Sequence, residues 1–198
     1  MLSPAWWVRT TLPLLATVLL LVPGGLEGGQ AGSGEGEQAR KTEAPCTRKA
    51  VPLPAGWRHA STREASSEWR GRDRCRHLVV RADFNGDGLN DQAELLLSES
   101  GPEFNLFAFV AQRDGTYREY RLGDALPLDY FEVMGIRVVR PGSYRTACGK
   151  GYAACEAGEP KVLRLRTWAI DFFKEESANS FFYWERRAAS FKRVWISD

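Results

Sequence analysis

The chain has 198 residues and carries 27 Lys and Arg against 25 Asp and Glu, which gives a net charge of +2. Binding to nucleic acid or to an anionic membrane surface needs a concentrated basic surface, and a charge this small and evenly spread does not supply one. We therefore expect no nucleic-acid partner.

The N-terminal residues have the pattern of an export signal. Arg9 supplies a positive charge, and residues 10–22 are almost unbrokenly apolar before Pro23. A membrane-spanning helix needs about 20 apolar residues, so this shorter run favours a signal peptide over residues 1–31, cleaved after Ala31, rather than an uncleaved anchor. The mature chain would then have no stable membrane span and would be periplasmic or secreted.

Residues 32–45 are mostly Gly, Ser, Glu, Gln and Ala. Such a segment cannot bury enough apolar surface to offset its chain entropy, so it is predicted to be a disordered linker. Residues 46–198 are long enough to form one domain with its own core.

Four cysteines in a chain predicted to be exported favour two disulfides. Four cysteines allow three pairings, and spacing alone does not choose among them. Zinc is disfavoured because no C-x-x-C pair occurs. The pairs that we expect are Cys46 with Cys75 and Cys148 with Cys155.

One short helix is predicted near the start of the domain. Ser61 and Glu64 match a capping box, residues 65–69 could continue the helix, and Gly71 would end it. The arginines that follow lack interleaved aromatic residues, so they are interpreted as a solvated loop: Arg70, Arg72, Arg74 and Arg76.

The rest of the domain has the pattern of β-strands. Asp114-Gly115 between two strand-like runs is a strong hairpin signal. We predict a mainly β fold, with α+β as an alternative, built as an antiparallel sandwich or curled sheet. No internal repeat is visible, so the chain does not form a propeller by itself. The strand-like segments are residues 77–82, 93–97, 104–112, 117–122, 136–139, 162–166, 169–173, 180–184 and 191–196.

The motif that points most directly to chemistry is Asp-Phe-Asn-Gly-Asp-Gly-Leu-Asn-Asp at residues 83–91. Oxygen-bearing side chains stand at positions 1, 3, 5 and 9, glycine at position 6 permits a sharp turn, and position 7 offers its carbonyl. A cation would relieve carboxylate repulsion on the order of 1 kcal/mol per close pair. The alternative is a glycine-rich turn whose side chains bond only their own backbone. The predicted Ca²⁺ ligands are Asp83, Asn85, Asp87, the carbonyl of Leu89 and Asp91, with Glu94 as a further candidate.

An EF-hand is one possible setting for this loop, because Glu94 stands at position 12, where that motif places its bidentate ligand. The flanking segments, however, have the pattern of strands, and position 8 is Asn90. If both flanks are strands, Glu94 alternates with the core-facing Ala93 and Leu95 and could point to solvent.

Residues 83–91 together with the strand at 93–97 resemble the calcium loop of the FG-GAP and VCBS-type repeats of extracellular β-proteins. The resemblance covers about fifteen residues, and it implies the same loop ligands between two strands. The flanking pieces of those repeats are absent, so it does not imply their propeller. More loosely, the chain is similar to small exported bacterial proteins, and neither resemblance implies catalytic residues.

No catalytic motif is recognisable. His59 and His77 have no partner in sequence, and paired carboxylates for acid-base work are possible only if distant segments converge. The sequence therefore predicts an exported calcium-binding β domain, a structural or binding module of the cell envelope whose partner is an envelope protein or a glycan. The alternatives are a secreted hydrolase and an EF-hand-like calcium sensor. The carboxylates that could serve a hydrolase are Asp129, Glu132, Asp171, Glu175 and Glu176.

Overall fold

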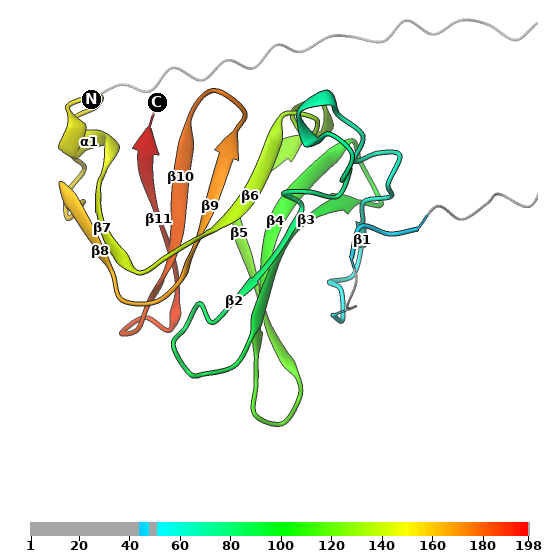
Figure 1. Cartoon of the computed structure of the whole chain (residues 1–198). Helices are drawn as coiled ribbons and strands as arrows, with labels where there is room; N and C mark the ends of the chain where they lie inside the picture. Colours follow the sequence, from blue (N-terminus) through cyan, green and yellow to red (C-terminus); the bar gives the residue numbers. More distant parts are fainter. Residues whose placement is uncertain (1–43, 48–50, 198) are drawn as a thin grey trace, which may run out of the picture. The chain divides into compact units, whose positions relative to one another are not determined.

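A computed structural model describes residues 44–47 and 51–197 (Figure 1). The predicted signal peptide and nearly all of the predicted linker lie outside these residues. The strands are β1 Trp57–His59, β2 Val79–Ala82, β3 Asp91–Ser98, β4 Glu103–Ala111, β5 Tyr117–Pro127, β6 Met134–Val139, β7 Gly142–Arg145, β8 Val162–Leu165, β9 Ala169–Lys174, β10 Asn179–Glu185 and β11 Ser190–Ser197. The helices are α1 Ala147–Lys150 and two 3-10 turns, η1 Glu68–Arg70 and η2 Leu128–Tyr130.

The first sheet has five strands and is built around β3. Its order is β1-β3-β4-β5, and β2 also pairs with β3. β2 pairs with the first half of β3 and β1 with the second half, so both share one edge of that strand. The predicted hairpin joins β4 and β5, and Gly115 takes the positive φ of 84° that its turn requires.

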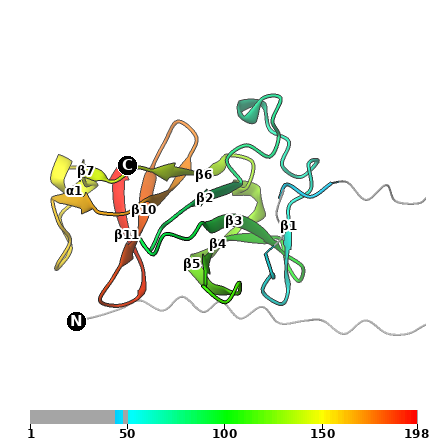
Figure 2. The ribbon, with the colours of Figure 1, turned by 60° about the horizontal axis from the view of Figure 1, so that its bottom comes forward.

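The second sheet has four strands in the order β11-β10-β9-β6, and β7 pairs with β8 in a separate two-stranded sheet. All of these pairings are antiparallel. β2 lies between β3 and β6 (Figure 2). The Ile136 N–H donates to the carbonyl of His77 across 2.8 Å. This contact joins the two sheets along one side.

The main core lies between the two sheets. Strand alternation sends Leu95, Leu106 and Ile170 into it from both sides, each no more than 1% exposed. Two smaller clusters cover the outer faces. One contains Val51, Leu96, Phe107 and Phe109, and the other contains Val139, Leu163, Leu165, Ala169, Phe181, Val194 and Ile196.

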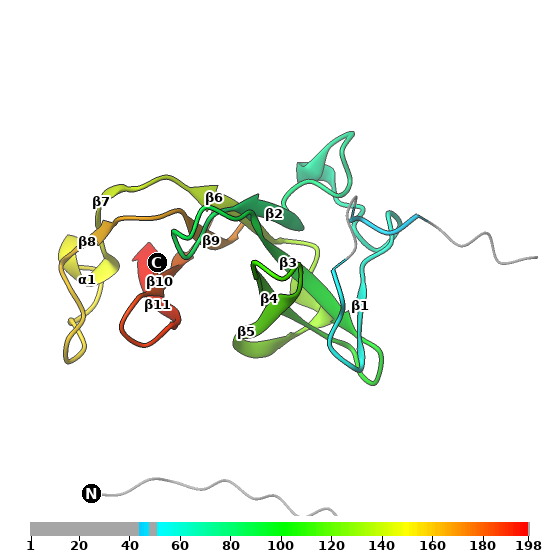
Figure 3. The same cartoon turned by 90° about the horizontal axis from the view of Figure 1, so that it is seen from below.

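This layering confirms the predicted mainly β, antiparallel fold. Figure 3 shows α1, β7 and β8 at one end of the domain and β1 at the other. Both predicted disulfides are present, Cys46–Cys75 and Cys148–Cys155. Among the described residues, no helix is long and apolar enough to cross a membrane.

The helix predicted after Ser61 does not form, although its capping box does. The Ser61 N–H donates to Glu64 Oε2 at 2.9 Å, and the Glu64 N–H donates to Ser61 Oγ at 3.3 Å. The chain then turns extended at Ser67, with φ −151° and ψ 153°, so only the 3-10 turn η1 follows. The described α-helix is instead α1, which Thr146 caps by accepting from the Gly149 N–H.

Arg70 corrects the interpretation of the arginine-rich segment as a solvated loop. Arg72, Arg74 and Arg76 are exposed, but Arg70 is 1% exposed. Its guanidinium donates to the carbonyls of residues 65, 131 and 134. Arg70 therefore fastens the η1 region to the segment that leads into β6.

Candidate functional site

The loop predicted to bind calcium joins β2 to β3, and Ala82 and Asp91 form the last strand pair before it. Both flanks are strands, so the loop does not belong to a helix-loop-helix EF-hand. Gly86 and Gly88 adopt φ values of 79° and 88°, which residues with a Cβ atom rarely adopt. These two glycines let the backbone turn tightly enough for its amides to face inward.

Asp83 is the centre of this turn. Its Oδ1 accepts the N–H groups of Gly86 at 2.7 Å and Asp87 at 3.1 Å, and its Oδ2 accepts that of Gly88 at 2.9 Å. A carboxylate has about four lone-pair positions, so three are used by the backbone. The loop is thus wrapped around the first predicted ligand.

Asn85 and Asp87 complete the exposed part of the loop. Asn85 donates its amide to Asp87 Oδ2 at 2.8 Å and accepts the Asp87 N–H at 3.0 Å. Asp87 Oδ1 accepts the N–H of Leu89 at 2.8 Å. Three of the predicted ligands, with Leu89 beside them, are therefore brought together around one turn.

Asp91 has a different role in this structure. It is fully buried, its Oδ2 accepts the Phe84 N–H, and its Oδ1 accepts the Ala111 N–H, both at 2.9 Å. Burial raises the pKa of Asp91 to about 6, although both amides oppose the shift. Asp91 therefore ties the start of the loop to the end of β4.

Glu94 lies away from the loop and does not point to solvent. It is 1% exposed on the face of β3 opposite the main core, where it contacts His59 Nδ1 at 2.6 Å and accepts from Gln92 at 2.9 Å. Gln92 in turn accepts from Arg81. Burial raises the pKa of Glu94, and the neighbouring His59 opposes this.

The contact between His59 and Glu94 was missed from the sequence, where the two residues are 35 positions apart. Strand alternation could have placed Gln92 and Glu94 on one face of β3, but it does not predict that β1 pairs with β3 and brings His59 beside them. A carboxylate that orients a histidine is also a part of many general-base sites. In the part of the chain that the structure describes, no Ser, Thr or Cys side chain forms a hydrogen bond with the pair, and the arrangement acts as a buried polar link between β1, β3 and β2.

The donor set of the loop fits a hard cation such as Ca²⁺ in part. No group of three or more His, Cys, Asp or Glu side chains within residues 44–47 and 51–197 could hold a metal ion. Calcium at this turn would draw its oxygens from Asp83, Asp87, the amide of Asn85 and the Leu89 carbonyl, with water completing the shell.

A fixed positive charge lies beside this turn. A Cβ built on Gly86 would come within 2.8 Å of Thr167 Cγ2 and 3.0 Å of Arg186 Nη2. The loop therefore packs against the connection before β9 and the turn between β10 and β11. Because the Arg186 guanidinium lies this close, it lowers the attraction of the loop for a cation.

The remaining candidates for acid-base work do not form one constellation. Asp171 is buried and bound to Arg137 at 2.6 Å and Asn179 at 2.8 Å, and burial raises its pKa. Asp129 and Glu132 line a separate cavity of about 240 Å³. Glu175 and Glu176 lie in the connection between β9 and β10.

His77 lies in a packed setting rather than in a catalytic one. Its ring stacks on Trp69 at 5.4 Å, and its Nδ1 lies 3.2 Å from the carbonyl of Ile136. Burial lowers the pKa of this imidazole, which favours the neutral form. His77 therefore contributes to the contact between β2 and β6.

The fold and the loop define an antiparallel β domain with two disulfides and an oxygen-rich turn between two strands. In comparisons with known proteins, no family model matches the chain, and no curated protein or solved structure matches it significantly.

Proposed function

We propose that this protein is an exported β domain whose β2–β3 loop binds one Ca²⁺, and that it serves as a structural or binding module of the cell envelope. The ion would hold the loop closed and would take no part in a reaction. An affinity of roughly 10⁻⁴ to 10⁻³ M is typical of extracellular modules, and the nearby Arg186 is consistent with weak binding.

One observation carries the proposal. The side chains of Asp83, Asn85 and Asp87 surround a single exposed turn, where Asn85 and Asp87 are in direct contact. Two carboxylates and an amide oxygen at alternate positions match the donors that Ca²⁺ prefers. The likeness of this loop to those of the FG-GAP and VCBS-type repeats agrees with the same ligands.

The compartment is proposed from two separate features. The first is the apolar N-terminal run, which has the length of the apolar core of a signal peptide. The second is the pair of disulfides, which persist in oxidising compartments. Together they support a periplasmic or secreted location.

The alternatives have less support. A calcium sensor of the EF-hand type moves helices that flank its loop, and here strands flank it. A hydrolase would need converging carboxylates, and the candidates lie in separate places. A module that holds a rigid surface for a partner is the function that the geometry favours.

Thermal unfolding of protein purified after expression of the full chain, with calcium and with excess EDTA, tests the calcium site. A ligand that binds only the folded state at 100 times its Kd adds about 2.7 kcal/mol. For a domain of this size that raises the Tm by about 5–11 °C.

Two variants locate the effect. Asp87→Asn should lose most of the calcium-dependent shift, whereas Asp73→Asn, which changes an exposed carboxylate outside the loop, should keep it. If EDTA does not change the Tm of the unaltered protein, the loop is only a turn. If Asp87→Asn lowers the Tm equally with calcium and with EDTA, Asp87 supports the turn and not the ion.

A further inference from the structure

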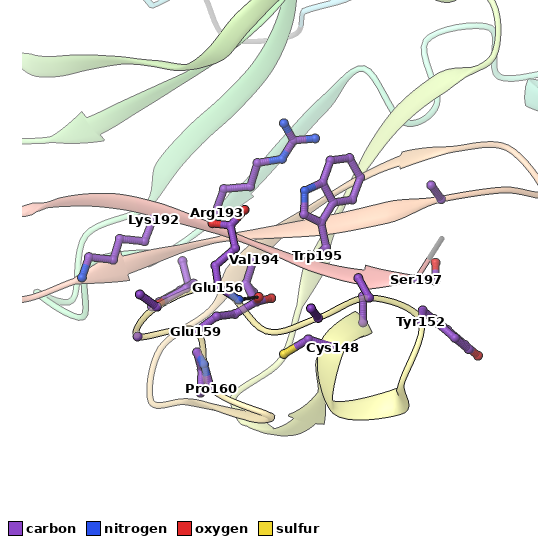
Figure 4. A pocket seen from close by; sticks show the side chains of 17 residues that line it. Cys148, Tyr152, Glu156, Glu159, Pro160, Lys192, Arg193, Val194, Trp195 and Ser197 are labelled. Atoms are coloured by element: carbon purple, nitrogen blue, oxygen red, sulfur yellow. Dashed lines mark hydrogen bonds between the residues drawn. The ribbon is translucent and has the colours of Figure 1, made fainter. Parts of the chain in front are cut away.

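A groove of about 690 Å³ follows β11, the edge strand of the second sheet (Figure 4). We call it the β11 groove. One side is formed by residues 192–195 and 197 at the end of β11, with Tyr183 of β10 beside them, and the other by residues 152–154 and 156–160 of the loop after α1. The Cys148–Cys155 disulfide closes part of this loop, so both sides of the groove are held in place.

Among the described strands, β11 has a partner strand on one side only. β10 is its partner on one side, and the sheet ends at β11 on the other. Among the described residues, one hydrogen bond reaches a backbone group of β11 from outside the β10 pairing: Lys150 Nζ donates to the carbonyl of Ile196 at 2.8 Å. Strand edges of this kind are templates for a further strand.

The two faces beside the free edge of β11 differ in charge. Arg193 and Trp195 share one face of β11, where the guanidinium carbon of Arg193 lies 4.2 Å from the centre of the Trp195 ring. Arg193 Nε donates to Ser180, and within the described part of the chain its two terminal nitrogens have no hydrogen bond. In Figure 4 both side chains point away from the loop that carries Glu156 and Glu159.

Charged residues also protect edge strands against aggregation, and Lys192 and Arg193 could serve that purpose alone. An edge protected in that way does not need a second wall. Here a disulfide-closed loop faces the strand on one side, and Trp195 is 47% exposed on the face of β11 that points away from this loop. An exposed aromatic ring and unpaired main-chain groups are typical anchors for a partner.

We propose that the β11 groove binds an extended polypeptide segment of a partner protein, which adds to β11 as a further strand. Side chains alternate along such a strand, so one set would face Arg193 and Trp195 and the other would face Glu156 and Glu159. Charge complementarity then selects acidic residues for the first set and basic residues for the second. This inference rests on the proposed function as a binding module, and it names the class of partner.

The test uses ¹⁵N-labelled protein purified after expression of the full chain, and an end-blocked octapeptide of alternating Glu and Lys as the probe. We expect concentration-dependent shifts of backbone amide signals in residues 192–196. Two further octapeptides are N-methylated at all odd or at all even positions. In an added strand, every second N–H faces the neighbouring strand, here β11. One of the two methylated peptides should therefore bind at least tenfold more weakly than the unmethylated octapeptide, and the other should bind almost as well.

Protein variants test whether the peptide contacts Trp195. Trp195→Ala should weaken binding at least tenfold, whereas Tyr130→Ala, which removes an aromatic side chain of the same 47% exposure elsewhere, should leave it unchanged. Trp195→Phe should restore part of the affinity, which separates a lost contact from misfolding. Equal loss in both alanine variants would overturn the proposal.

The titration is repeated with a hexamer of N-acetylglucosamine and with EDTA. If the saccharide shifts the β11 signals and the peptide does not, the groove binds a glycan and the proposal is wrong. If the peptide does not bind while calcium still raises the Tm, the groove inference fails and the calcium site stands. If the peptide binds while EDTA leaves the Tm unchanged, the groove stands and the calcium site fails.

Discussion

Replacing Arg70 with alanine is expected to destabilise the domain strongly, although it lies in an arginine-rich segment that is otherwise exposed. Its Nη1 donates to Ala65 O and Ser67 Oγ, both at 3.1 Å, and its Nη2 donates to the carbonyls of Phe131 and Met134 at 2.9 and 2.7 Å. Burial lowers the pKa of this guanidinium to about 10, so it stays charged at neutral pH.

The size of this stability loss follows from the backbone carbonyls that Arg70→Ala would leave without a hydrogen-bond donor. Residues 65, 131 and 134 are each at most 8% exposed, so three carbonyls would lose their donor in places where water has little access. Each buried acceptor without a partner costs about 1–3 kcal/mol. Removing the buried cation recovers part of that, because its desolvation no longer opposes folding. We expect a net loss of about 3 kcal/mol, or about 6–12 °C in Tm.

Urea-induced unfolding with the disulfides intact, followed by tryptophan fluorescence, measures this loss. Arg72→Ala is the matched control, because Arg72 is exposed two residues away and should change stability by less than about 0.5 kcal/mol. Arg70→Met fills the same volume without donors and should lose nearly as much as Arg70→Ala. Equal stabilities for Arg70→Ala and Arg72→Ala, or full rescue by methionine, would refute the reasoning.

Two further predictions concern other parts of the domain. A hydrogen bond from Arg58 lowers the pKa of Glu64 from 4.5 to about 2, so its stabilisation is complete above about pH 4.5 and is lost as the pH falls through 2. Glu64→Gln should therefore reduce the free energy of unfolding at pH 7 but not near pH 2, and a constant difference between the two proteins across that range would contradict this. Gly149→Ala should destabilise the α1 region, because a Cβ there would collide with the carbonyl oxygen of Lys161; an unchanged Tm would show that the two segments can separate without cost.

Local patterns in the sequence predicted local structure well. The hairpin at residues 114–115 follows from two residues whose backbone preferences suit one turn. The capping box at Ser61 and Glu64 also formed, because its bonds join residues three apart. The helix after it did not form, since tertiary contacts of Arg70 draw the chain into a different path.

Contacts between distant segments could not be predicted in the same way. The loop at residues 83–91 is marked by its own spacing, so its ligands could be proposed from the sequence. The pair of His59 and Glu94 depends on β1 docking beside β3, and nothing in either segment specifies that partner. The β11 groove likewise depends on where the loop after α1 packs relative to β11.

The segment between β6 and β9 leaves the second sheet and returns to it, so the register of the sheet does not depend on the wall that faces β11. Val139 and Ala169 are paired neighbours in the second sheet, so the chain leaves and re-enters that sheet at adjacent points. The segment between them could therefore be exchanged without shifting the strand register, provided that its replacement presents a similar apolar face to the second sheet. This segment includes β7, α1 and the loop at residues 152–160. A family of variants made in this way would share one scaffold and differ in the wall that faces β11, as antibodies share a framework and differ in their loops.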